Sequence, residues 1–435
     1  MSEQRTYVTT PIYYVNDRPH IGHAYCTILA DTYRRYCELF GEETYFLTGT
    51  DEHGQKVQEA AEARGISPRQ HVDELHQTFK GLLPEILAEP NDFIRTTEDR
   101  HVKVVQKALK DLFEKGDIYL GTYEGWYSAR AERFWTEKDL VDGKCPDTGG
   151  PVERVQEDNY FFRMSAYQDK LIEHMEKNRE WVVPSSRWAE VRSFLKQPLE
   201  DLSISRPKER LSWGIPLPFN ENYVTYVWFD ALLNYITAIG YGEDEAMFER
   251  WWPASHHFLG KDILTTHTVY WGTMLMAMGL PLPSKLCATG WWLVDNTKMS
   301  KSLGNVIDPL SLKDRYGPEI LRYFLMRDMV IGLDASFSEE ALVRRNNSDL
   351  ANDLGNLVRR TLSLVERYFA GKVPEKGPEG EEDAALQEQI NKLPEIVVSK
   401  VRNFRLHESI EECMQVVRAM NRYIDHTAPY KVIKE

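Results

Sequence analysis

The sequence lacks a long apolar run, a paired-cysteine pattern and a surplus of positive charge. No segment reaches the roughly 18 consecutive apolar residues that a bilayer-spanning helix needs, and the first residues do not form a signal peptide. The five cysteines include no C-x-x-C pair, so we expect reduced thiols rather than a disulfide framework. These absences predict a cytoplasmic protein.

The formal net charge of -14 argues against a broad, non-specific grip on nucleic acid, since that grip depends on neutralising phosphates with Lys and Arg. A local basic face is still compatible with it. The apolar fraction of 42% and the charged fraction of 28% are typical of a globular protein. A chain of 435 residues has room for about three domains.

The chain opens with a β/α pattern. Residues 7–10 and 44–47 are short β-branched or aromatic runs that predict strands. Apolar side chains recur at three- and four-residue steps over residues 21–40, and residues 55–64 form a second helical segment. Strands that alternate with helices in this way predict a parallel doubly wound sheet.

The pattern changes over residues 117–221 to short aromatic strands and turns, which predicts an inserted domain. Beyond it, residues 223–229 and 257–259 are again typical of strands, so the insertion splits the predicted sheet into two halves. From residue 338 onward nearly every segment is helical and amphipathic. The exception is a Pro/Gly/Glu linker at residues 373–383.

The segment Pro19-His20-Ile21-Gly22-His23 lies at the first expected strand-to-helix junction. A glycine there lets a phosphate approach the backbone, and the positive end of a helix favours an anion. His20 and His23, three residues apart, can donate to phosphate oxygens from one face of the first turn. From these residues alone, histidines that merely cap the helix are an equally good interpretation.

Lys298 and Lys301 belong to a polar stretch rich in Ser, Gly and Asn that cannot pack a core. Two ammonium groups on such a loop suit the negative charge of a displaced pyrophosphate. In isolation a loop of this kind is usually solvated surface. The presence of the histidine segment in the same chain gives the lysines their significance.

Together, the histidine segment and Lys298-Met299-Ser300-Lys301-Ser302 match the two signatures of class I aminoacyl-tRNA synthetases. Further segments resemble the bacterial methionyl-tRNA synthetases, in the same order along the chain: residues 11–16, 49–54, 226–231 and 260–263. The chain is identified as a member of that family, which it resembles from Tyr7 to its last residue.

The resemblance implies a two-step reaction. The carboxylate of methionine attacks the α-phosphate of ATP, which is bound with Mg²⁺, giving methionyl-adenylate and pyrophosphate. The methionyl group then passes to the 3′ end of tRNA(Met) for translation. No protein nucleophile is needed, because the enzyme aligns the reactants and stabilises charge. The implied catalytic and ATP-binding residues are His20, Gly22, His23, Lys298 and Lys301.

The family also implies a domain order that agrees with the pattern of the chain. Residues 1–116 and 222–292 form the two halves of a Rossmann-type catalytic core, and residues 117–221 form the connective insertion. Residues 293–345 carry the lysine loop in a stem-contact region, and residues 346–435 form an all-α anticodon-binding domain. We expect no membrane partner, and a monomer if the chain has no C-terminal dimerisation domain.

Matching motif positions imply a methionine pocket in which Asp51 faces the substrate ammonium. Without the resemblance, Trp228 and Tyr235, seven residues apart, would be read as an ordinary core face. An apolar, aromatic pocket suits an unbranched thioether. The implied pocket residues are Ile12, Tyr14, Asp51, Trp228, Ala231, Tyr235, Ile263 and His267.

Zinc marks a departure from the family pattern. Many relatives have cysteine knuckles in the insertion, and here the matching positions are Ser128, Ala131, Cys145 and Thr148. One thiolate cannot build a tetrahedral site, so we expect a degenerate knuckle without zinc. Packing of nearby aromatic side chains should hold it instead: Trp126, Phe134 and Trp135.

The last helices carry Asn356 and Arg360, four residues apart, and Tyr430 near the end of the chain. In the family the matching Asn and Arg, with a Trp at the third place, read the tRNA anticodon; here Tyr replaces Trp. The chain stops soon after Tyr430, so the anticodon-binding domain is expected to be incomplete, as in a truncated or partial chain. Four arginines predict a local phosphate-binding face: Arg344, Arg345, Arg359 and Arg360.

Three alternatives are compatible with parts of the sequence. A class I synthetase for leucine, isoleucine or valine would need an editing domain, for which residues 117–221 are too few. A non-catalytic tRNA-binding scaffold has no need of pyrophosphate-handling lysines. A small-molecule adenylyltransferase with a similar histidine turn would not need the long helical C-terminal region.

Overall fold

The computed structural model describes residues 4–15, 17–128, 133–135, 137–146, 148–225, 227–299 and 305–432. The chain forms two compact units. The sheet unit comprises Met1–Pro19, Gly41–Pro84 and Ala88–Ala288. The helical unit comprises His20–Phe40, Glu85–Leu87 and Thr289–Glu435. The first helix of the chain therefore belongs to the unit that also contains the C-terminal helices.

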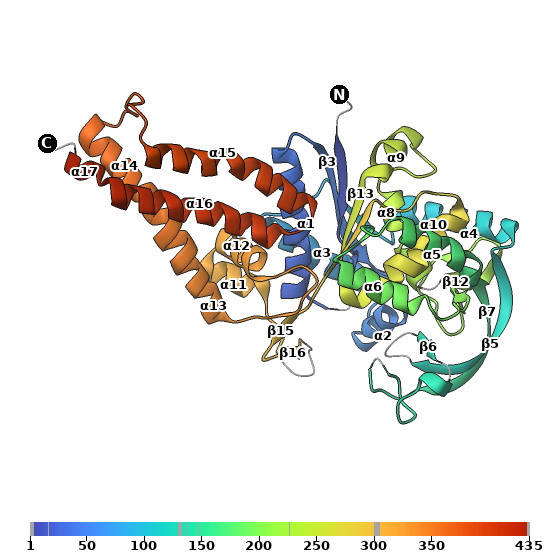
Figure 1. Cartoon of the computed structure of the whole chain (residues 1–435). Coiled ribbons are helices and arrows are strands. Elements are labelled where there is room, and N and C mark those ends of the chain that lie inside the picture. The colour runs from blue at the N-terminus through green and yellow to red at the C-terminus, as the bar shows by residue number, and fades with distance from the viewer. Residues whose placement is uncertain are drawn as a thin grey trace. The chain divides into compact units, whose positions relative to one another are not determined.

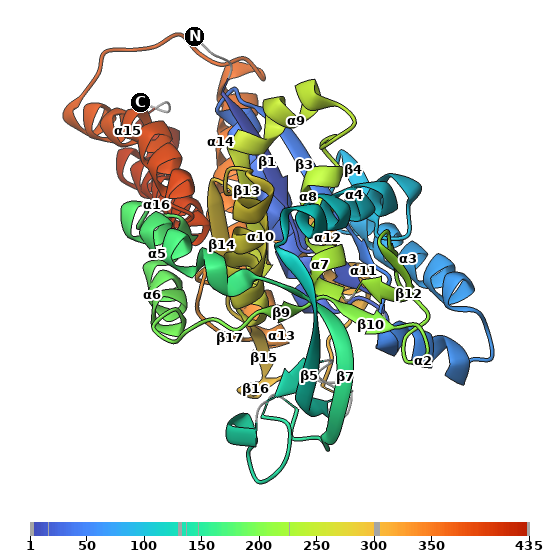
Figure 2. The same ribbon diagram turned by 90° about the vertical axis from the view of Figure 1, so that its right-hand side faces the viewer.

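The described part of the sheet unit is built on a seven-stranded sheet (Figure 2). Its order is β2-β3-β1-β13-β14-β8, and β4 also pairs with β3. The pairs of β1 with β3 and β13, of β3 with β2 and β4, and of β14 with β8 are all parallel. The strands are β1 (Arg5–Thr9), β2 (Tyr13–Tyr14), β3 (Glu43–Asp51), β4 (Asp92–Arg95), β8 (Val182–Val183), β13 (Ser255–Gly260) and β14 (Lys285–Thr289). The predicted Rossmann-type sheet is confirmed.

Strand β3 is buried along its second half, as expected for a parallel strand covered on both faces. It also requires a glycine. A Cβ at Gly49 would lie 2.0 Å from the backbone oxygen of Ile94 on β4, so a side chain there would force the two strands apart. Gly49 thus sets the spacing of β3 and β4 two residues before Asp51.

Helices of the sheet unit pack apolar faces into one large core. In α4 the buried Val104, Val105, Ala108, Leu109 and Leu112 recur at helical spacing, and the helix ends at Gly116 with a φ of 82°. The helices are α2 (Gln55–Ala63), α3 (Pro68–Glu85), α4 (Asp99–Lys115), α7 (Val227–Ala231), α8 (Asn234–Thr237), α9 (Glu245–Trp251) and α10 (Trp271–Met278), with a π-helical turn at Thr266–Tyr270.

In its described residues, the segment predicted as an insertion contains two antiparallel sheets and two α-helices. One sheet has the order β6-β5-β7-β9 and the other β10-β12-β11. Strands β5 and β7 form a long pair in Figure 2. The same segment also supplies β8 to the parallel sheet. The elements are β5 (Ile118–Ser128), β6 (Arg133–Trp135), β7 (Glu153–Phe162), α5 (Gln168–Lys177), α6 (Ser185–Phe194), β9 (Leu202–Ser203), β10 (Ser205–Pro207), β11 (Pro216–Leu217) and β12 (Asn220–Thr225).

The strand predicted over residues 223–229 is wrong in its extent and partners. Strand β12 ends at Thr225 and pairs antiparallel with β10 and β11, and helix α7 begins at Val227. The β-branched and aromatic run favours a strand locally. Its second half is helical because tertiary contacts decide such short runs, among them those of the fully buried Asp230.

The helical unit contains α1 and the C-terminal helices, and Figure 1 shows α15 and α16 side by side. A small sheet of order β16-β15-β17 accompanies them. The elements are α1 (Ile21–Leu39), β15 (Trp292–Val294), β16 (Thr297–Lys298), α11 (Pro309–Tyr316), α12 (Pro318–Asp328), β17 (Ala335–Ser336), α13 (Glu339–Arg345), a π-helical segment (Asn346–Gly355), α14 (Asn356–Phe369), α15 (Glu381–Arg402), α16 (Leu406–Thr427) and α17 (Pro429–Val432). The predicted all-α C-terminal region is confirmed.

Helix α1 is fixed to α12 by a buried acidic side chain. Asp31 has no exposed surface, and its carboxylate contacts Arg34 at 2.9 Å, Arg35 at 2.8 Å and Arg322 of α12 at 2.6 Å. Burial alone would raise the pKa of Asp31, but Arg322, Arg34 and Arg35 outweigh it and lower that pKa. Helix α1, which begins with the histidine segment, is therefore held to α12 by ion pairs within the helical unit.

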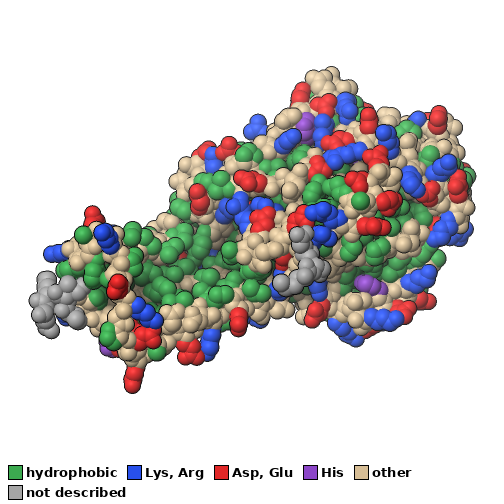
Figure 3. Space-filling view, turned by 90° about the horizontal axis from the view of Figure 1, so that it is seen from above, with side chains coloured by type: hydrophobic (Ala, Val, Ile, Leu, Met, Phe, Trp, Pro, Cys, Tyr) green, Lys and Arg blue, Asp and Glu red, His purple; other side chains and the backbone are tan. Residues whose placement is uncertain are grey.

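Helix α14 is the least buried of the long helices. None of its described residues is buried, and Val358 and Leu362 are 48% and 62% exposed. Hydrophobic side chains are visible along the surface of the helical unit in Figure 3. Strand β3 of the parallel sheet is therefore largely buried, whereas helix α14 is largely exposed.

Candidate active site

The two histidines at the start of α1 are caps of that helix. The backbone N–H of Gly22 donates to Nδ1 of His20 at 3.0 Å, and the backbone N–H of His20 donates to Nδ1 of His23 at 3.0 Å. A neutral imidazole that accepts at Nδ1 carries its proton on Nε2. Capping thus assigns each ring one N–H donor, at Nε2, and the two ring centroids lie 4.0 Å apart. The capping interpretation and the donor interpretation are compatible.

Gly22 is needed for this capped turn. A Cβ at that position would lie 2.8 Å from Cε1 of His20, closer than carbon atoms can approach without displacement. The helix start is also held by the N–H of Ile21, which donates to the carbonyl of Ile307 at 3.0 Å. The predicted phosphate turn therefore has a fixed backbone.

Only one lysine of the predicted pair lies within the described residues. Lys298 ends β16 and is exposed, and its Nζ lies 3.8 Å from the centroid of the Trp291 ring. Lys301, within residues 300–304, lies outside the described part of the chain.

On the sheet unit, two predicted methionine ligands lie on adjacent strands. Tyr14 of β2 is the register partner of Asp51, the last residue of β3. Asp51 is 5% exposed, and Tyr14 is half-buried with Nζ of Lys56 5.8 Å from its ring centroid. The carboxyl end of a parallel strand is where ligands of this fold bind, and Asp51 stands at that end.

Tyr235, Ile263 and His267 are brought together by a chain of hydrogen bonds. Nδ1 of His267 donates to the carbonyl of Ile263 at 2.9 Å, so Nε2 accepts from the hydroxyl of Tyr235 at 2.7 Å. Burial lowers the pKa of His267 to about 4. The pair is therefore neutral at neutral pH, which suits an uncharged substrate side chain.

The other predicted pocket residues are also buried or partly buried. Ala231 is 4% exposed, and Ile12, Trp228 and Ile263 are partly buried against the main core that contains Tyr235. All eight predicted methionine-pocket residues belong to the sheet unit, whereas His20, Gly22, His23 and Lys298 belong to the helical unit.

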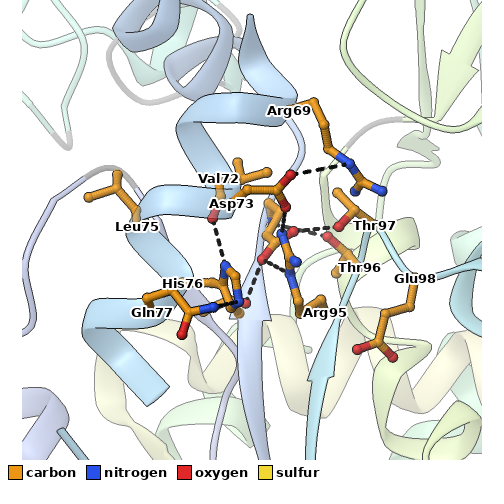
Figure 4. Close-up of polar contacts among 12 residues, drawn as sticks. Arg69, Val72, Asp73, Leu75, His76, Gln77, Arg95, Thr96, Thr97 and Glu98 are labelled. Atoms are coloured by element: carbon orange, nitrogen blue, oxygen red, sulfur yellow. Dashed lines mark hydrogen bonds and ion pairs between the residues drawn. The ribbon is translucent and has the colours of Figure 1, made fainter. Parts of the chain in front are cut away.

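The loop after β3 contains a buried acidic side chain, Glu52, that the sequence interpretation missed. Figure 4 labels two of its partners, Arg95 and Thr97. The Glu52 carboxylate has no exposed surface and accepts from Thr50 at 2.8 Å, Arg95 at 2.7 Å and Thr97 at 2.5 Å. Arg95 also contacts Asp73 of α3 at 2.5 Å. This network fixes the backbone directly after Asp51. The signal for it was weak, because an acidic residue within a Gly-rich loop is usually solvated.

A further buried histidine was also missed. His257 of β13 lies under Tyr235, with ring centroids 4.2 Å apart, and its Nδ1 lies 2.7 Å from the hydroxyl of Thr9. Burial, with smaller contributions from His267 and His256, lowers the pKa of His257. A histidine within a short strand such as β13 carries no sequence signal that separates this role from ordinary packing.

The helical unit has a basic, aromatic pocket near its C-terminal end. Arg360 and Tyr430, both predicted, line it, and Arg360 also contacts Asp425. The third predicted residue, Asn356, begins α14 and accepts from Arg359 at 3.1 Å, but it is not among the lining residues. The lining residues are Arg359, Arg360, Ser363, Leu364, Arg367, Tyr368, Ile424 and Tyr430.

Of the four arginines predicted to form one phosphate-binding face, Arg359 and Arg360 line this pocket. Arg345 is instead engaged with Asp328 at 3.0 Å and with the buried Asp349 at 3.6 Å. Its charge is compensated by these acidic groups, so it contributes little attraction for a phosphate.

In the insertion, Trp126 of β5 is the register partner of Trp135 of β6, and Cys145 is 1% exposed. Within the described ranges no three His, Cys, Asp or Glu side chains are grouped to hold a metal. Ala131 lies outside those ranges, and the absence of zinc stays a prediction. No helix among the same residues is both long and apolar enough to cross a bilayer.

A family model described as tRNA synthetases class I (M) matches residues 6–154 and 148–362. The chain therefore belongs to the class I tRNA synthetases, and within that class to the family so described. The methionine–tRNA ligase of Caldanaerobacter subterraneus subsp. tengcongensis is 48% identical over 430 residues, which are 99% of this chain and 67% of that relative. The methionine–tRNA ligase of Thermotoga maritima is 44% identical over 433 residues, with coverages of 99% and 68%.

Solved structures agree with this assignment. Mycobacterium tuberculosis methionyl-tRNA synthetase in complex with methionyl-adenylate superposes with a TM-score of 0.95 at 41% identity, covering 99% of this chain and 86% of that one. The apo form of the same enzyme gives a TM-score of 0.86 at 38% identity, with coverages of 100% and 84%.

Proposed function

We propose that this chain is a methionine–tRNA ligase. It activates methionine with ATP to form methionyl-adenylate and pyrophosphate, and it transfers the methionyl group to the 3′ end of tRNA(Met). The observation that carries the choice of amino acid is the neutral, buried Tyr235–His267 pair, in the same core as Ile12, Trp228 and Ile263. A site of this character accepts an unbranched apolar side chain and offers no partner to a charged one.

Methionine is held at two points in this proposal. Its ammonium pairs with the carboxylate of Asp51, and its thioether lies among aromatic and aliphatic side chains. Sulfur–aromatic contacts contribute modestly, about 0.3–1.5 kcal/mol each. A methylene difference discriminates by only about 1–3 kcal/mol, so analogues such as norleucine should be activated weakly.

The nucleotide is handled by groups of the helical unit. The Nε2–H donors of His20 and His23 and the backbone at Gly22 bind the phosphates of ATP, which enters as its Mg²⁺ complex. Lys298 and Lys301 stabilise the negative charge that develops on the departing pyrophosphate. This role requires only positioned positive charge, because methionine itself supplies the attacking carboxylate.

Anticodon recognition rests on the pocket at the C-terminal end of the helical unit. Arg360 can donate to base edges, and Tyr430 and Tyr368 offer rings on which unpaired bases stack. Asn356, at the start of α14, adds an amide on the same helix as Arg360. We place the activity in the cytoplasm and propose a monomer if the chain has no C-terminal dimerisation domain, with the five-segment domain order predicted from its sequence.

The deciding experiment is ATP–pyrophosphate exchange with each amino acid in turn. Methionine should stimulate exchange strongly, and leucine, isoleucine and valine should not. Exchange with another apolar amino acid but not with methionine would show that the specificity is wrong. Exchange with none, together with retained tRNA binding, would favour a non-catalytic tRNA-binding protein.

Charging of tRNA(Met) tests the second step separately. The rate of methionyl-tRNA formation should fall when the CAU anticodon is replaced, while exchange stays the same. Equal charging of tRNAs with unrelated anticodons would contradict the role proposed for the pocket that contains Arg360 and Tyr430.

A further inference from the structure

One buried carboxylate in the sheet unit is held between two histidines. Oδ2 of Asp230 lies 2.6 Å from Nδ1 of His53, and Oδ1 lies 2.7 Å from Nε2 of His101. All three side chains are buried: Asp230 is 1% exposed, His101 0% and His53 7%. Motif matching covers His53 and Asp230 but assigns no role to either, and His101 belongs to no motif.

The chemistry of the cluster fixes its proton positions. Burial alone would raise the pKa of Asp230, but the electrostatic interaction with His53 and the hydrogen bonds from both imidazoles outweigh burial and lower the pKa to about 2. An ionised carboxylate only accepts hydrogen bonds. Nδ1 of His53 and Nε2 of His101 are therefore both N–H donors. Each carboxylate oxygen accepts a charge-assisted hydrogen bond.

The cluster joins segments that carry the proposed methionine ligands. His53 follows Asp51 by two residues, in the loop after β3. Asp230 lies in α7 between Trp228 and Ala231, which are both proposed pocket residues. His101 lies on a third element, α4, and contacts the carboxylate oxygen that His53 does not contact. One side chain thus connects the group that binds the substrate ammonium to the groups that bind its thioether.

The loop after Asp51 is also held by the hydrogen bonds of Glu52. Glu52 accepts from Thr50, Arg95 and Thr97, and its carbonyl accepts from Nε1 of Trp213 at 2.6 Å. The residue after Asp51 and the residue after that are therefore anchored by different partners. A loop fixed at consecutive residues has little freedom, so a change at His53 or Asp230 is transmitted to Asp51 rather than absorbed.

We propose that Asp230, His53 and His101 are positioning residues of the methionine site, which hold the Asp51 loop and helix α7 at the separation that methionine requires. The inference rests on the proposed function, since it assumes that Asp51 and Trp228 bind the amino acid. None of the three residues touches the reacting atoms. Their loss should raise the KM for methionine and leave the KM for ATP unchanged.

The test compares a donor-deleting with a donor-retaining substitution at the least buried member. His53→Ala removes the N–H donor to Asp230, whereas the amide nitrogen of His53→Asn can replace Nδ1. In methionine-dependent ATP–pyrophosphate exchange, His53→Ala should raise the KM for methionine at least tenfold. His53→Asn should keep it within about threefold of the wild-type value, whereas His53→Leu, which fills a similar volume without an N–H donor, should behave like His53→Ala.

Asp230→Asn tests the acceptor. Its amide cannot accept from both imidazole N–H groups at once, so the KM for methionine should rise at least as much as in His53→Ala. Asp117→Asn is the matched control, because Asp117 is also buried in the sheet unit and accepts from Tyr167 at 2.8 Å without contacting the proposed site. It should leave both KM values unchanged even if it lowers the melting temperature.

Several results would overturn the proposal. They are equal losses in His53→Ala and His53→Asn, a parallel rise of the KM for ATP, and wild-type KM values in both Asp230→Asn and His53→Ala. If Asp230→Asn does not fold, the His53 variants still decide. Absence of methionine-dependent exchange in the wild-type protein would contradict the proposed function itself, and the same comparison with the amino acid that it does activate would then decide the positioning role.

Discussion

The two units of this chain differ in the burial of the residues proposed to bind ligands. In the sheet unit the residues proposed to hold methionine are buried or half-buried, and several are hydrogen-bonded to one another, as in the Tyr235–His267 pair. In the helical unit the residues proposed to meet phosphates and tRNA include cations with solvent contact, such as the exposed Lys298 and the 25% exposed side chain of Arg360.

The difference follows from the ligands. A small apolar amino acid has few groups that form directional interactions, so its site must be rigid and preorganised before binding. Phosphates and single-stranded bases carry strong charge and large flat faces, and exposed arginines, lysines and tyrosines meet them without prior burial. We therefore expect substitutions in the sheet unit to act on affinity for methionine, and substitutions in the helical unit to act on adenylation rate or tRNA affinity.

The largest expected effect is that of Asp51→Asn. Removing one member of a buried ion pair costs about 3–5 kcal/mol, or roughly 10²–10³-fold or more in affinity. The kcat/KM for methionine in exchange should fall by that factor while the KM for ATP stays constant. A loss below about threefold would show that Asp51 does not contact the ammonium.

Lys298→Ala and Lys301→Ala should show the opposite pattern. Loss of a group that stabilises transition-state charge lowers kcat by about 10²–10³-fold. The affinity for methionine, measured by equilibrium binding without ATP, should change little. Lys→Arg at either position is the control, because it keeps the charge. Equal losses in rate and in methionine affinity would mean that the lysine is structural.

Acid should weaken the sheet unit. Burial is the largest cause that lowers the pKa of His267 and of His256 to about 4, and the pKa of His257 is lowered for the same reason. The unfolded chain binds a proton at each near pH 6.5 while the folded chain does not, so the stabilisation is complete above pH 6.5 and is lost as pH falls towards 4.

Between pH 6.5 and pH 5 a histidine such as His267 should cost about 2 kcal/mol of unfolding free energy. Denaturant titrations followed by tryptophan fluorescence should therefore show a falling midpoint over that interval. His267→Gln should flatten the dependence by about one proton. A midpoint that is constant from pH 8 to pH 5 would contradict the burial of neutral imidazoles.

The smallest expected effect is that of Arg360→Ala, which should raise the KM for tRNA(Met) by about tenfold, since a base-contacting arginine contributes about 1–3 kcal/mol. Exchange without tRNA should be unchanged. Tyr430→Phe keeps the stacking face and should charge normally, whereas Tyr430→Ala should resemble Arg360→Ala. Altered exchange in any of these variants would place them outside a purely tRNA-binding role.

Much of the architecture could be predicted because it depends on local sequence patterns. Alternating strands and helices predicted the parallel sheet, and the periodicity after Pro19 predicted α1, which begins one residue after His20. The strand over residues 223–229 failed because a β-branched, aromatic run does not distinguish a strand from a helix whose polar residue is held by distant partners.

The roles of Glu52, His53, His101 and Asp230 could not be predicted for the same reason. Their partners lie 43 residues away for Glu52 and Arg95, 129 for His101 and Asp230, and 177 for His53 and Asp230. Within its own segment each is an ordinary polar residue, and only burial makes its protonation state and its partner consequential.

The sequence by itself determined the family, the parallel sheet and the identity of the histidine and lysine groups, because these depend on residue type and on short-range spacing. The tertiary structure alone decided which nitrogen of His20 and His23 carries the proton, that the Tyr235–His267 pair is neutral, and that Asp230 bridges the Asp51 loop to α7. Those properties arise from burial and from contacts between segments far apart in the chain, where the low dielectric makes each hydrogen bond selective.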